Sequence, residues 1–107
     1  MNNPKSTIKF YRNFSFIEWR QNDKRHRLDG PAIECANGDK FWLQNGLRHR
    51  LDGPAVELIS GDKGWFQNGL RHRLDGPAIE SADGTRYWHI NGVWLTQQEH
   101  SERIKNE

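Results

Sequence analysis

The octapeptide RHRLDGPA at residues 25–32 recurs unchanged at residues 48–55 and 71–78. The copies start at residues 25, 48 and 71, so the spacing between successive copies is the same. An identical block at a fixed period is the sequence signature of a repeat architecture, in which each copy packs against its neighbours. The rest of the chain can be aligned to this block.

The same period continues outside the octapeptide. It governs four tryptophans, four asparagines and the glycines that follow three of these asparagines: Trp19, Trp42, Trp65 and Trp88; Asn22, Asn45, Asn68 and Asn91; Gly46, Gly69 and Gly92. We therefore expect a single repeat domain over residues 1–107, with a degenerate first unit (5–24), three repeats (25–47, 48–70 and 71–93) and a C-terminal helical cap (94–107). The first unit is degenerate because TIKFYRNFS at residues 7–15 stands where the next unit has PAIECANG.

Three turns are expected in each unit. The Asn-Gly pair of FWLQNGLR (41–48) favours a type I′ hairpin turn, because both residues tolerate positive φ. Asp-Gly-Pro gives a second reversal, and its glycine is expected to take backbone angles closed to other residues; these glycines are Gly30, Gly53 and Gly76. A third turn follows the short strands AIECA, AVELI and AIESA, and it contains Gly38, Gly61 or Gly84. Each unit is thus predicted to hold roughly two short strands.

These elements predict an all-β fold of tandem 23-residue β-hairpin repeats that form one elongated, curved antiparallel sheet. Stacking places equivalent side chains in rows, about two strand separations apart. Ile33, Val56 and Ile79 are expected in an apolar row, and the four tryptophans in another. Because strand side chains alternate between faces, Glu34, Glu57 and Glu80 are expected on the opposite, solvated face.

The C-terminal segment VWLTQQEHSERIKNE (93–107) replaces the next octapeptide. Thr96 and Glu99 have the spacing of a capping box, which predicts a short helix over residues 97–105. We expect Trp94, Leu95 and Ile104 to cover the apolar edge of the last hairpin. His89 and His100 fall outside the period, so we expect them at the solvated surface.

Composition limits the classes of function. The chain has 16 Lys and Arg against 14 Asp and Glu, so an electropositive surface must be local. One cysteine gives neither an internal disulfide nor a thiolate metal site. No signal-peptide pattern and no run of 18 apolar residues occurs, so we expect a cytoplasmic protein without membrane insertion.

The histidines and aspartates of the octapeptide do not favour enzyme chemistry. Equivalent histidines about 10 Å apart are too distant to share a zinc ion, so we expect no metal and no cofactor. Three identical His–Asp pairs without a unique nucleophile also argue against a catalytic site. The sequence therefore predicts a non-enzymatic protein.

The octapeptide side chains can serve the repeat or a partner. Arg27, Arg50 and Arg73 can form ion pairs with the aspartates two residues on. The candidate binding residues are Arg25, Arg48, Arg71, His26, His49 and His72. The candidate structural residues are Trp19, Trp42, Trp65, Trp88, Asp29, Asp52, Asp75, Gly30, Gly53 and Gly76. A basic stripe interleaved with aromatic residues would suit phosphates or an acidic protein surface.

The pattern W-x-x-N-G-x-x-H-R-x-D-G-P-A, followed by a short strand and a turn, resembles the MORN-like repeats over roughly residues 19–95. It differs from the common MORN unit by an arginine after the histidine and by proline at residues 31, 54 and 77. In this it resembles the HRxDGPA variant of bacteriophage, large-virus and bacterial proteins. The resemblance implies a β-hairpin sheet with a binding or scaffolding role rather than a reaction.

The expected function is therefore that of a phage or viral accessory protein, an inhibitor of host defence that binds and blocks a host protein in the host cytoplasm. Two alternatives stay open. One is a nucleic-acid-binding protein that uses the arginine stripe, and the other is a structural module that assembles with further copies of itself.

Overall fold

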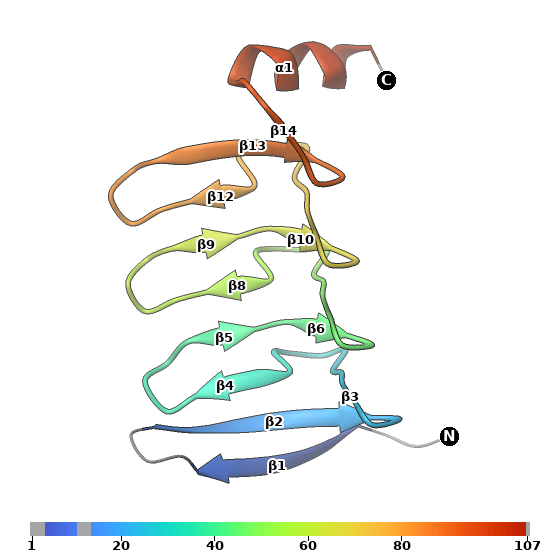
Figure 1. Cartoon of the computed structure of the whole chain (residues 1–107), viewed down its shortest axis with the longest axis vertical. Helices are drawn as coiled ribbons and strands as arrows, with labels where there is room; N and C mark the ends of the chain where they lie inside the picture. Colours follow the sequence, from blue (N-terminus) through green and yellow to red (C-terminus); the bar gives the residue numbers. More distant parts are fainter. Residues whose placement is uncertain (1–3, 11–13, 107) are drawn as a thin grey trace.

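The computed structural model describes residues 4–10 and 14–106, and they form mostly antiparallel β-sheet with many hairpins and one short C-terminal helix (Figure 1). The strands are β1 (Lys5–Phe10), β2 (Ser15–Gln21), β3 (Lys24–Arg25), β4 (Ile33–Cys35), β5 (Lys40–Phe41), β6 (Leu43–Gln44), β7 (Leu47–Arg48), β8 (Val56–Glu57), β9 (Lys63–Gly64), β10 (Phe66–Gln67), β11 (Leu70–Arg71), β12 (Ile79–Glu80), β13 (Arg86–Ile90) and β14 (Val93–Leu95). The helix α1 spans Gln97–Lys105. The molecule is a thin slab with extents of 44 × 36 × 17 Å.

The main sheet follows the chain from one end of the slab to the other. Its order is β1-β2-β4-β5-β8-β9-β12-β13-β14, and β3 pairs with β2 off this path. Two further hairpins, β6-β7 and β10-β11, form separate two-stranded sheets. In Figure 1 the chain climbs level by level from β1 and β2 to α1, with wide loops on one side and tight turns on the other.

The tight turns have the predicted type I′ geometry. Asn45 and Gly46 have φ of 52° and 80°, and the pairs at residues 68–69 and 91–92 have similar angles. The amide of each turn glycine also donates to an arginine carbonyl of the preceding octapeptide, as from Gly46 to Arg25 and from Gly69 to Arg48, both at 2.8 Å. Each turn is therefore hydrogen-bonded to the chain segment of the preceding level.

The tryptophan of each period interrupts the strand that was predicted around it. The Trp42 N–H donates to the Ala55 carbonyl at 2.7 Å, whereas the Trp42 carbonyl accepts from the His49 N–H at 3.0 Å. Trp65 makes the equivalent bonds to Ala78 and His72. The N–H and the carbonyl of each tryptophan thus bond to different chain segments, and the strand is interrupted at this residue. Residues 25–71 therefore contain more and shorter strands than the sequence predicted.

The core is narrow and rests on small side chains. The octapeptide alanines Ala32, Ala55 and Ala78 are fully buried at 0% exposure. The other buried apolar side chains among the described residues are Phe16, Leu43, Phe66, Pro77, Ile90 and Leu95. Ile33, Val56 and Ile79 are only half-buried, so the predicted apolar row lies at a surface.

The helix α1 begins as predicted. The Thr96 hydroxyl accepts from the Glu99 N–H at 3.1 Å, and the Glu99 carboxylate accepts from the Thr96 N–H at 2.9 Å, which completes the capping box. Leu95 is buried, but the prediction for Trp94 was wrong because 70% of this residue is exposed. In the part of the chain that the structure describes, no helix has the length and apolar character needed to cross a membrane.

Candidate binding surface

The two arginines of each octapeptide lie on different surfaces. Arg48 ends β7 and lines a cavity of about 330 Å³ together with Phe41, Val56 and Phe66. Arg50 lies beyond the end of β7, directly before the bend at residues 51–53, and lines two other cavities, among the exposed octapeptide loops. We call the row Arg25, Arg48 and Arg71 the arginine column, and the octapeptide loops around Arg27, Arg50 and Arg73 the loop face.

Each loop-face arginine is fully engaged within the protein. The Arg50 guanidinium lies 3.9 Å from the centre of the Trp42 ring and donates from Nε to Asp52 at 3.0 Å. It also donates to the carbonyl of Pro54 at 3.0 Å and to the Glu57 carboxylate at 3.3 Å. Arg27 and Arg73 have the same stacking and the same aspartate and proline partners. The expected arginine–aspartate ion pairs are therefore present.

The sequence predicted a solvated face for the row of Glu34, Glu57 and Glu80, but these glutamates are partly covered by arginines. Arg73 donates to the Glu80 carboxylate at 3.1 Å, as Arg50 does to Glu57, and Arg27 lies 3.8 Å from Glu34. These glutamate side chains are only about a third exposed, at 33–36%. The long guanidinium reaches over its tryptophan to this row, so the glutamates support the arginines.

The octapeptide glycines are required for a reason that differs from the prediction. Gly30, Gly53 and Gly76 are absent from the residues with positive φ, so the expectation that they take backbone angles closed to other residues was wrong. A Cβ atom on Gly53 would instead lie 2.9 Å from Cζ of Arg50, and the other two positions meet Arg27 and Arg73 in the same way. The missing side chain makes room for the stacked guanidinium.

The octapeptide histidines hold the tight turns. Nδ1 of His26 accepts a hydrogen bond from the Asn45 N–H at 3.0 Å, and His49 and His72 accept from Asn68 and Asn91 in the same way. His49 and His72 line the loop-face cavities. The structure therefore separates His49 and His72 from the arginine column, with which the sequence grouped them as binding residues.

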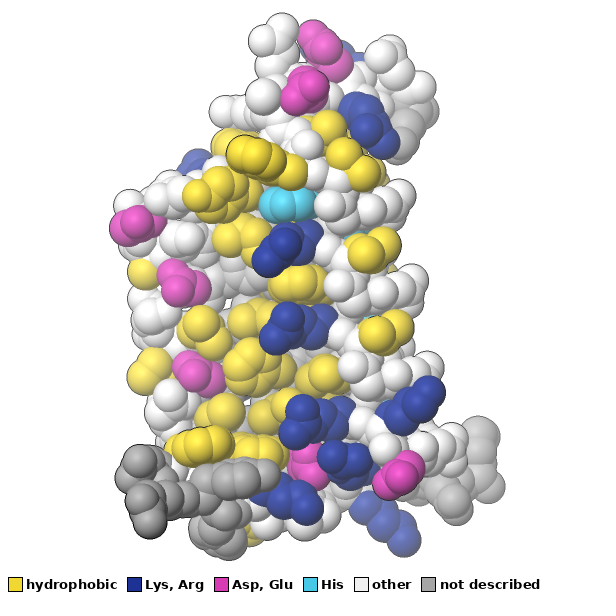
Figure 2. All heavy atoms as spheres, viewed as in Figure 1, with side chains coloured by type: hydrophobic (Ala, Val, Ile, Leu, Met, Phe, Trp, Pro, Cys, Tyr) yellow, Lys and Arg dark blue, Asp and Glu magenta, His cyan; other side chains and the backbone are white. Residues whose placement is uncertain are grey.

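The arginine column is flanked by apolar side chains. Figure 2 shows the basic side chains as a vertical column with hydrophobic side chains beside it. Arg48 and Arg71 are exposed, and the Arg48 guanidinium lies 5.4 Å from the centre of the Phe66 ring. Among the residues that the structure describes, neither Arg48 nor Arg71 has a carboxylate partner. These two cations are free to meet an external anion.

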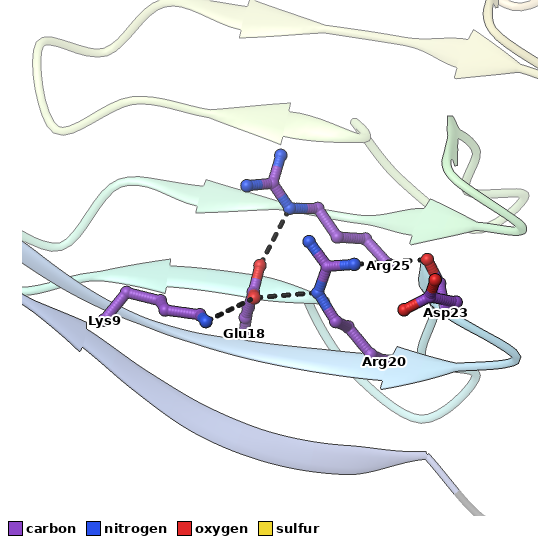
Figure 3. A network of polar contacts seen from close by, with 5 residues as sticks. All are labelled: Lys9, Glu18, Arg20, Asp23 and Arg25. Atoms are coloured by element: carbon purple, nitrogen blue, oxygen red, sulfur yellow. Dashed lines mark hydrogen bonds and ion pairs between the residues drawn. The ribbon is translucent and has the colours of Figure 1, made fainter.

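A buried carboxylate stands at the N-terminal end of the column (Figure 3). Glu18 is 1% exposed, and it accepts from Nε of Arg20 at 2.8 Å and from Nε of Arg25 at 2.9 Å, with Lys9 3.8 Å away. Burial raises the pKa of Glu18, but the hydrogen bonds and charges of the two arginines outweigh it, so the net pKa is lowered. The terminal nitrogens of Arg25 point away from Glu18 in Figure 3.

An aromatic cavity lies at the other end of the column. It has a volume of about 490 Å³, and its walls include Arg71, Tyr87, His89 and Trp94. The Tyr87 and Trp94 rings meet edge to face, with centroids 6.2 Å apart. Trp94 lies one sequence period after Arg71, so it occupies the next position of the column.

The two histidines outside the period are buried, and the expectation that they are solvated was wrong. His89 is 7% exposed, and burial together with the charge of Arg71 lowers its pKa. His100 is 3% exposed, and its Nε2 lies 2.7 Å from the Arg73 carbonyl. The contact from α1 to the last octapeptide explains the burial of His100. The sequence period could not reveal these contacts, because no other copy has a histidine at the position equivalent to His89, and His100 lies beyond the last repeat.

Comparisons with known proteins find no matching family model, no matching curated protein and no matching solved structure. Within residues 4–10 and 14–106, no three His, Cys, Asp or Glu side chains are grouped so that they could hold a metal ion. The choice of the arginine column as the candidate binding surface therefore depends on its geometry alone.

Proposed function

We propose that this chain is a non-enzymatic binding protein that contacts another protein through the arginine column and the apolar groove beside it, which is the cavity of about 330 Å³ lined by Phe41, Val56 and Phe66. One observation carries the proposal: Arg48 and Arg71 are exposed without a carboxylate partner in the described chain, whereas their neighbours Arg50 and Arg73 are saturated by internal contacts. Unpaired arginines beside aromatic rings are typical of protein interfaces, where arginine and aromatic residues are enriched.

The proposal includes the repeat architecture. We infer four units at the period of the octapeptide, of the MORN-like HRxDGPA type, stacked in a curved sheet. Hydrogen bonds that recur at the same period support this inference, such as Trp42 to Ala55 and Trp65 to Ala78, both at 2.7 Å. A stack of this kind offers an extended surface across several units rather than one deep pocket.

The biological setting follows from the resemblance to HRxDGPA proteins. We propose an accessory protein of a phage or virus that binds and blocks a host protein in the host cytoplasm. The partner surface should be acidic and partly apolar, because the column is cationic and its flank includes Phe41, Val56 and Phe66.

Two other functions each have one observation in their favour. The arginine column favours nucleic-acid binding, because exposed arginines contact phosphates. The edge strand β1 favours self-assembly, because β2 is its only strand partner in the described chain and an open edge can pair with another copy.

The test compares capture of proteins from a host lysate by the wild-type chain and by an Arg48→Ser/Arg71→Ser variant. Arg25 is left unchanged because it supports Glu18. We expect the partner's affinity to fall by about 1–3 kcal/mol. An Arg86→Ser/Arg103→Ser variant has the same change in charge at exposed positions off the column, so it should capture the partner normally.

Three results would contradict the proposal. Equal capture by both variants would exclude the column as the binding surface. Column-dependent binding of an oligonucleotide that weakens steeply with salt would support the nucleic-acid alternative. A molecular mass that rises with protein concentration, without capture of a partner, would support self-assembly.

A further inference from the structure

We propose that the segment bound by the arginine column is an amphipathic α-helix of the partner protein, with carboxylates that recur at every seventh position. This inference rests on the proposed function, because it specifies the ligand of the same surface. It is carried by the spacing of the column and by the apolar groove next to it.

The spacing of the column follows from the sheet topology. Between β5 and β9, which are one sequence period apart, the sheet contains one strand, β8. Equivalent residues therefore lie two strand separations apart, which is about 9.5 Å. The tight turns keep the same step, because Gly69 bonds to Arg48 and Gly92 bonds to Arg71 with equal lengths of 2.8 Å.

An α-helix matches this spacing. A step of seven positions makes nearly two turns and advances the helix by about 10.5 Å, so side chains seven apart stay on one face. Three such carboxylates span about 21 Å, against about 19 Å for the three arginines, and the flexible arginine side chains can absorb the difference.

An extended strand does not match. Its side chains on one face are about 6.6 Å apart, or about 13 Å for every second one, and neither distance equals the step of the column. Residues three apart in a strand would have nearly the right separation, but they point to opposite faces. The column therefore selects a helix over an added strand or an extended peptide.

The groove beside the column accepts the apolar stripe of such a helix. Phe41, Val56, Leu58, Phe66 and Ile79 form the apolar part of the cavity next to Arg48, which Asp62 and Lys63 also line. Apolar residues three and four positions after each carboxylate share its helix face, about 60° to one side and about 40° to the other. One of these two stripes therefore faces the groove when the carboxylates face the arginines.

At the C-terminal end of the column, the ligand is expected to carry an apolar residue in place of a carboxylate. Trp94 takes the place of a fourth arginine and is 70% exposed, beside Tyr87. An apolar residue seven positions beyond the last carboxylate would therefore meet an aromatic surface. Phosphates of a nucleic acid would gain nothing from this end of the column or from the apolar groove.

The test uses the full chain and two fluorescently labelled synthetic peptides of equal composition. In the heptad peptide, three glutamates lie seven positions apart, leucines follow each at the third and fourth positions, and alanine and glutamine fill the rest. In the shifted peptide the first glutamate exchanges places with the residue two positions on and the third with the residue two positions before it, so that each turns by about 200° around the helix and the seven-position step is lost. Fluorescence anisotropy at low salt measures both affinities.

We expect the heptad peptide to bind at least about tenfold more tightly than the shifted peptide, because its carboxylates pair with the exposed Arg48 and Arg71 and with the terminal nitrogens of Arg25 while its leucines meet the groove. An Arg48→Gln/Arg71→Gln variant should lose this preference, whereas Arg86→Gln/Arg103→Gln should keep it. Replacement of Trp94 by alanine should weaken binding of a heptad peptide that carries leucine seven positions beyond its last glutamate. It should not weaken binding of a peptide with glutamine at that position.

The outcomes separate the helix inference from the proposed function. Equal binding of the two peptides, or binding of neither, overturns the helix inference, while loss of lysate capture in the column variant would still support the binding surface. If the column variant binds the heptad peptide and captures lysate proteins as the wild type does, both proposals fail. Column-dependent binding of a single-stranded oligonucleotide in preference to the heptad peptide would overturn the helix in favour of nucleic acid.

Discussion

Arg48 and Arg50 belong to the same octapeptide and differ by two positions, yet their environments are opposite. Arg50 stacks on Trp42 and forms three hydrogen bonds, whereas Arg48 is exposed next to Phe66. The comparison teaches that invariance between copies of a repeat does not distinguish a structural residue from a surface residue. Each copy uses its loop-face arginine for internal contacts, whereas the second and third copies present a column arginine to solvent.

The largest expected effect separates these two arginines. Arg50→Gln removes a stacked cation and an ion pair and leaves carboxylates without their partner, so we expect it to lower the free energy of unfolding by about 2–4 kcal/mol. Arg48→Gln, the matched control, should change it by no more than about 0.5 kcal/mol. Urea unfolding of both variants measures the difference. Equal destabilisation would show that the column is part of the scaffold.

The next prediction concerns the one column arginine that has an internal partner in the described chain. Glu18→Gln leaves Arg20 and Arg25 without their buried counter-ion, so we expect a loss of about 1–3 kcal/mol at neutral pH. Because the pKa of Glu18 is lowered from its ordinary value of 4.5, its contribution is present above that pH and is lost as pH falls through the lowered pKa.

The variant should therefore lose less stability on acidification than the wild type does. Glu34→Gln is the control, because this half-buried glutamate lies 3.8 Å from Arg27 and should have a smaller effect. Identical acid unfolding profiles of the wild type and Glu18→Gln would mean that the buried network adds nothing to the pH dependence.

The octapeptide glycine gives a smaller and more specific effect. Gly53→Ala places a methyl group 2.9 Å from Cζ of Arg50, so we expect a loss of about 1–2 kcal/mol as the guanidinium is displaced. The loss should shrink when Arg50 is already replaced by glutamine, because the clash is then absent. Additive losses in this double-mutant cycle would instead assign the cost to the backbone.

The features that the sequence predicted well are those that short segments encode. Asn45-Gly46 specifies its turn by the conformations that the two residues tolerate, and Thr96 with Glu99 specifies the start of α1 by reciprocal capping. The period also predicted the pairing of Arg50 with Asp52, because residues so close in sequence can meet whatever the rest of the chain does.

The features that the sequence missed depend on packing between distant segments. The role of Gly53 follows from the position of the Arg50 side chain and not from its own φ, and Glu57 is partly covered because the same arginine reaches it. His100 is buried because α1 folds back onto the carbonyl of Arg73. A sequence pattern assigns faces from strand alternation, but β7 ends at Arg48, so this alternation does not extend to Arg50.

The smallest expected effect probes how the column changes near its C-terminal end. His89 stands one sequence period after Phe66, so Arg71 lies beside an imidazole where Arg48 lies beside a phenyl ring. Burial and the charge of Arg71 lower the pKa of His89 below 6.5, and the unfolded chain therefore binds this proton more readily than the folded chain does. Its contribution to stability is complete above pH 6.5 and falls as the pH drops from there towards the lowered pKa.

His89→Phe should remove this part of the pH dependence, since the equivalent position already holds Phe66. As the pH falls from 8 to 5.5, we expect the free energy of unfolding of the variant to rise relative to that of the wild type by less than about 1 kcal/mol. Urea unfolding of both chains at each pH measures this difference. Comparing the two profiles cancels the protonation of the other histidines, which both chains share. Arg71→Gln should give a weaker version of the same change, because it removes the repulsive charge but leaves the imidazole buried. If the difference in unfolding free energy between wild type and His89→Phe stays constant with pH, the imidazole acts by its shape alone. Arg71 would then pack against His89 in the same way as Arg48 packs against Phe66.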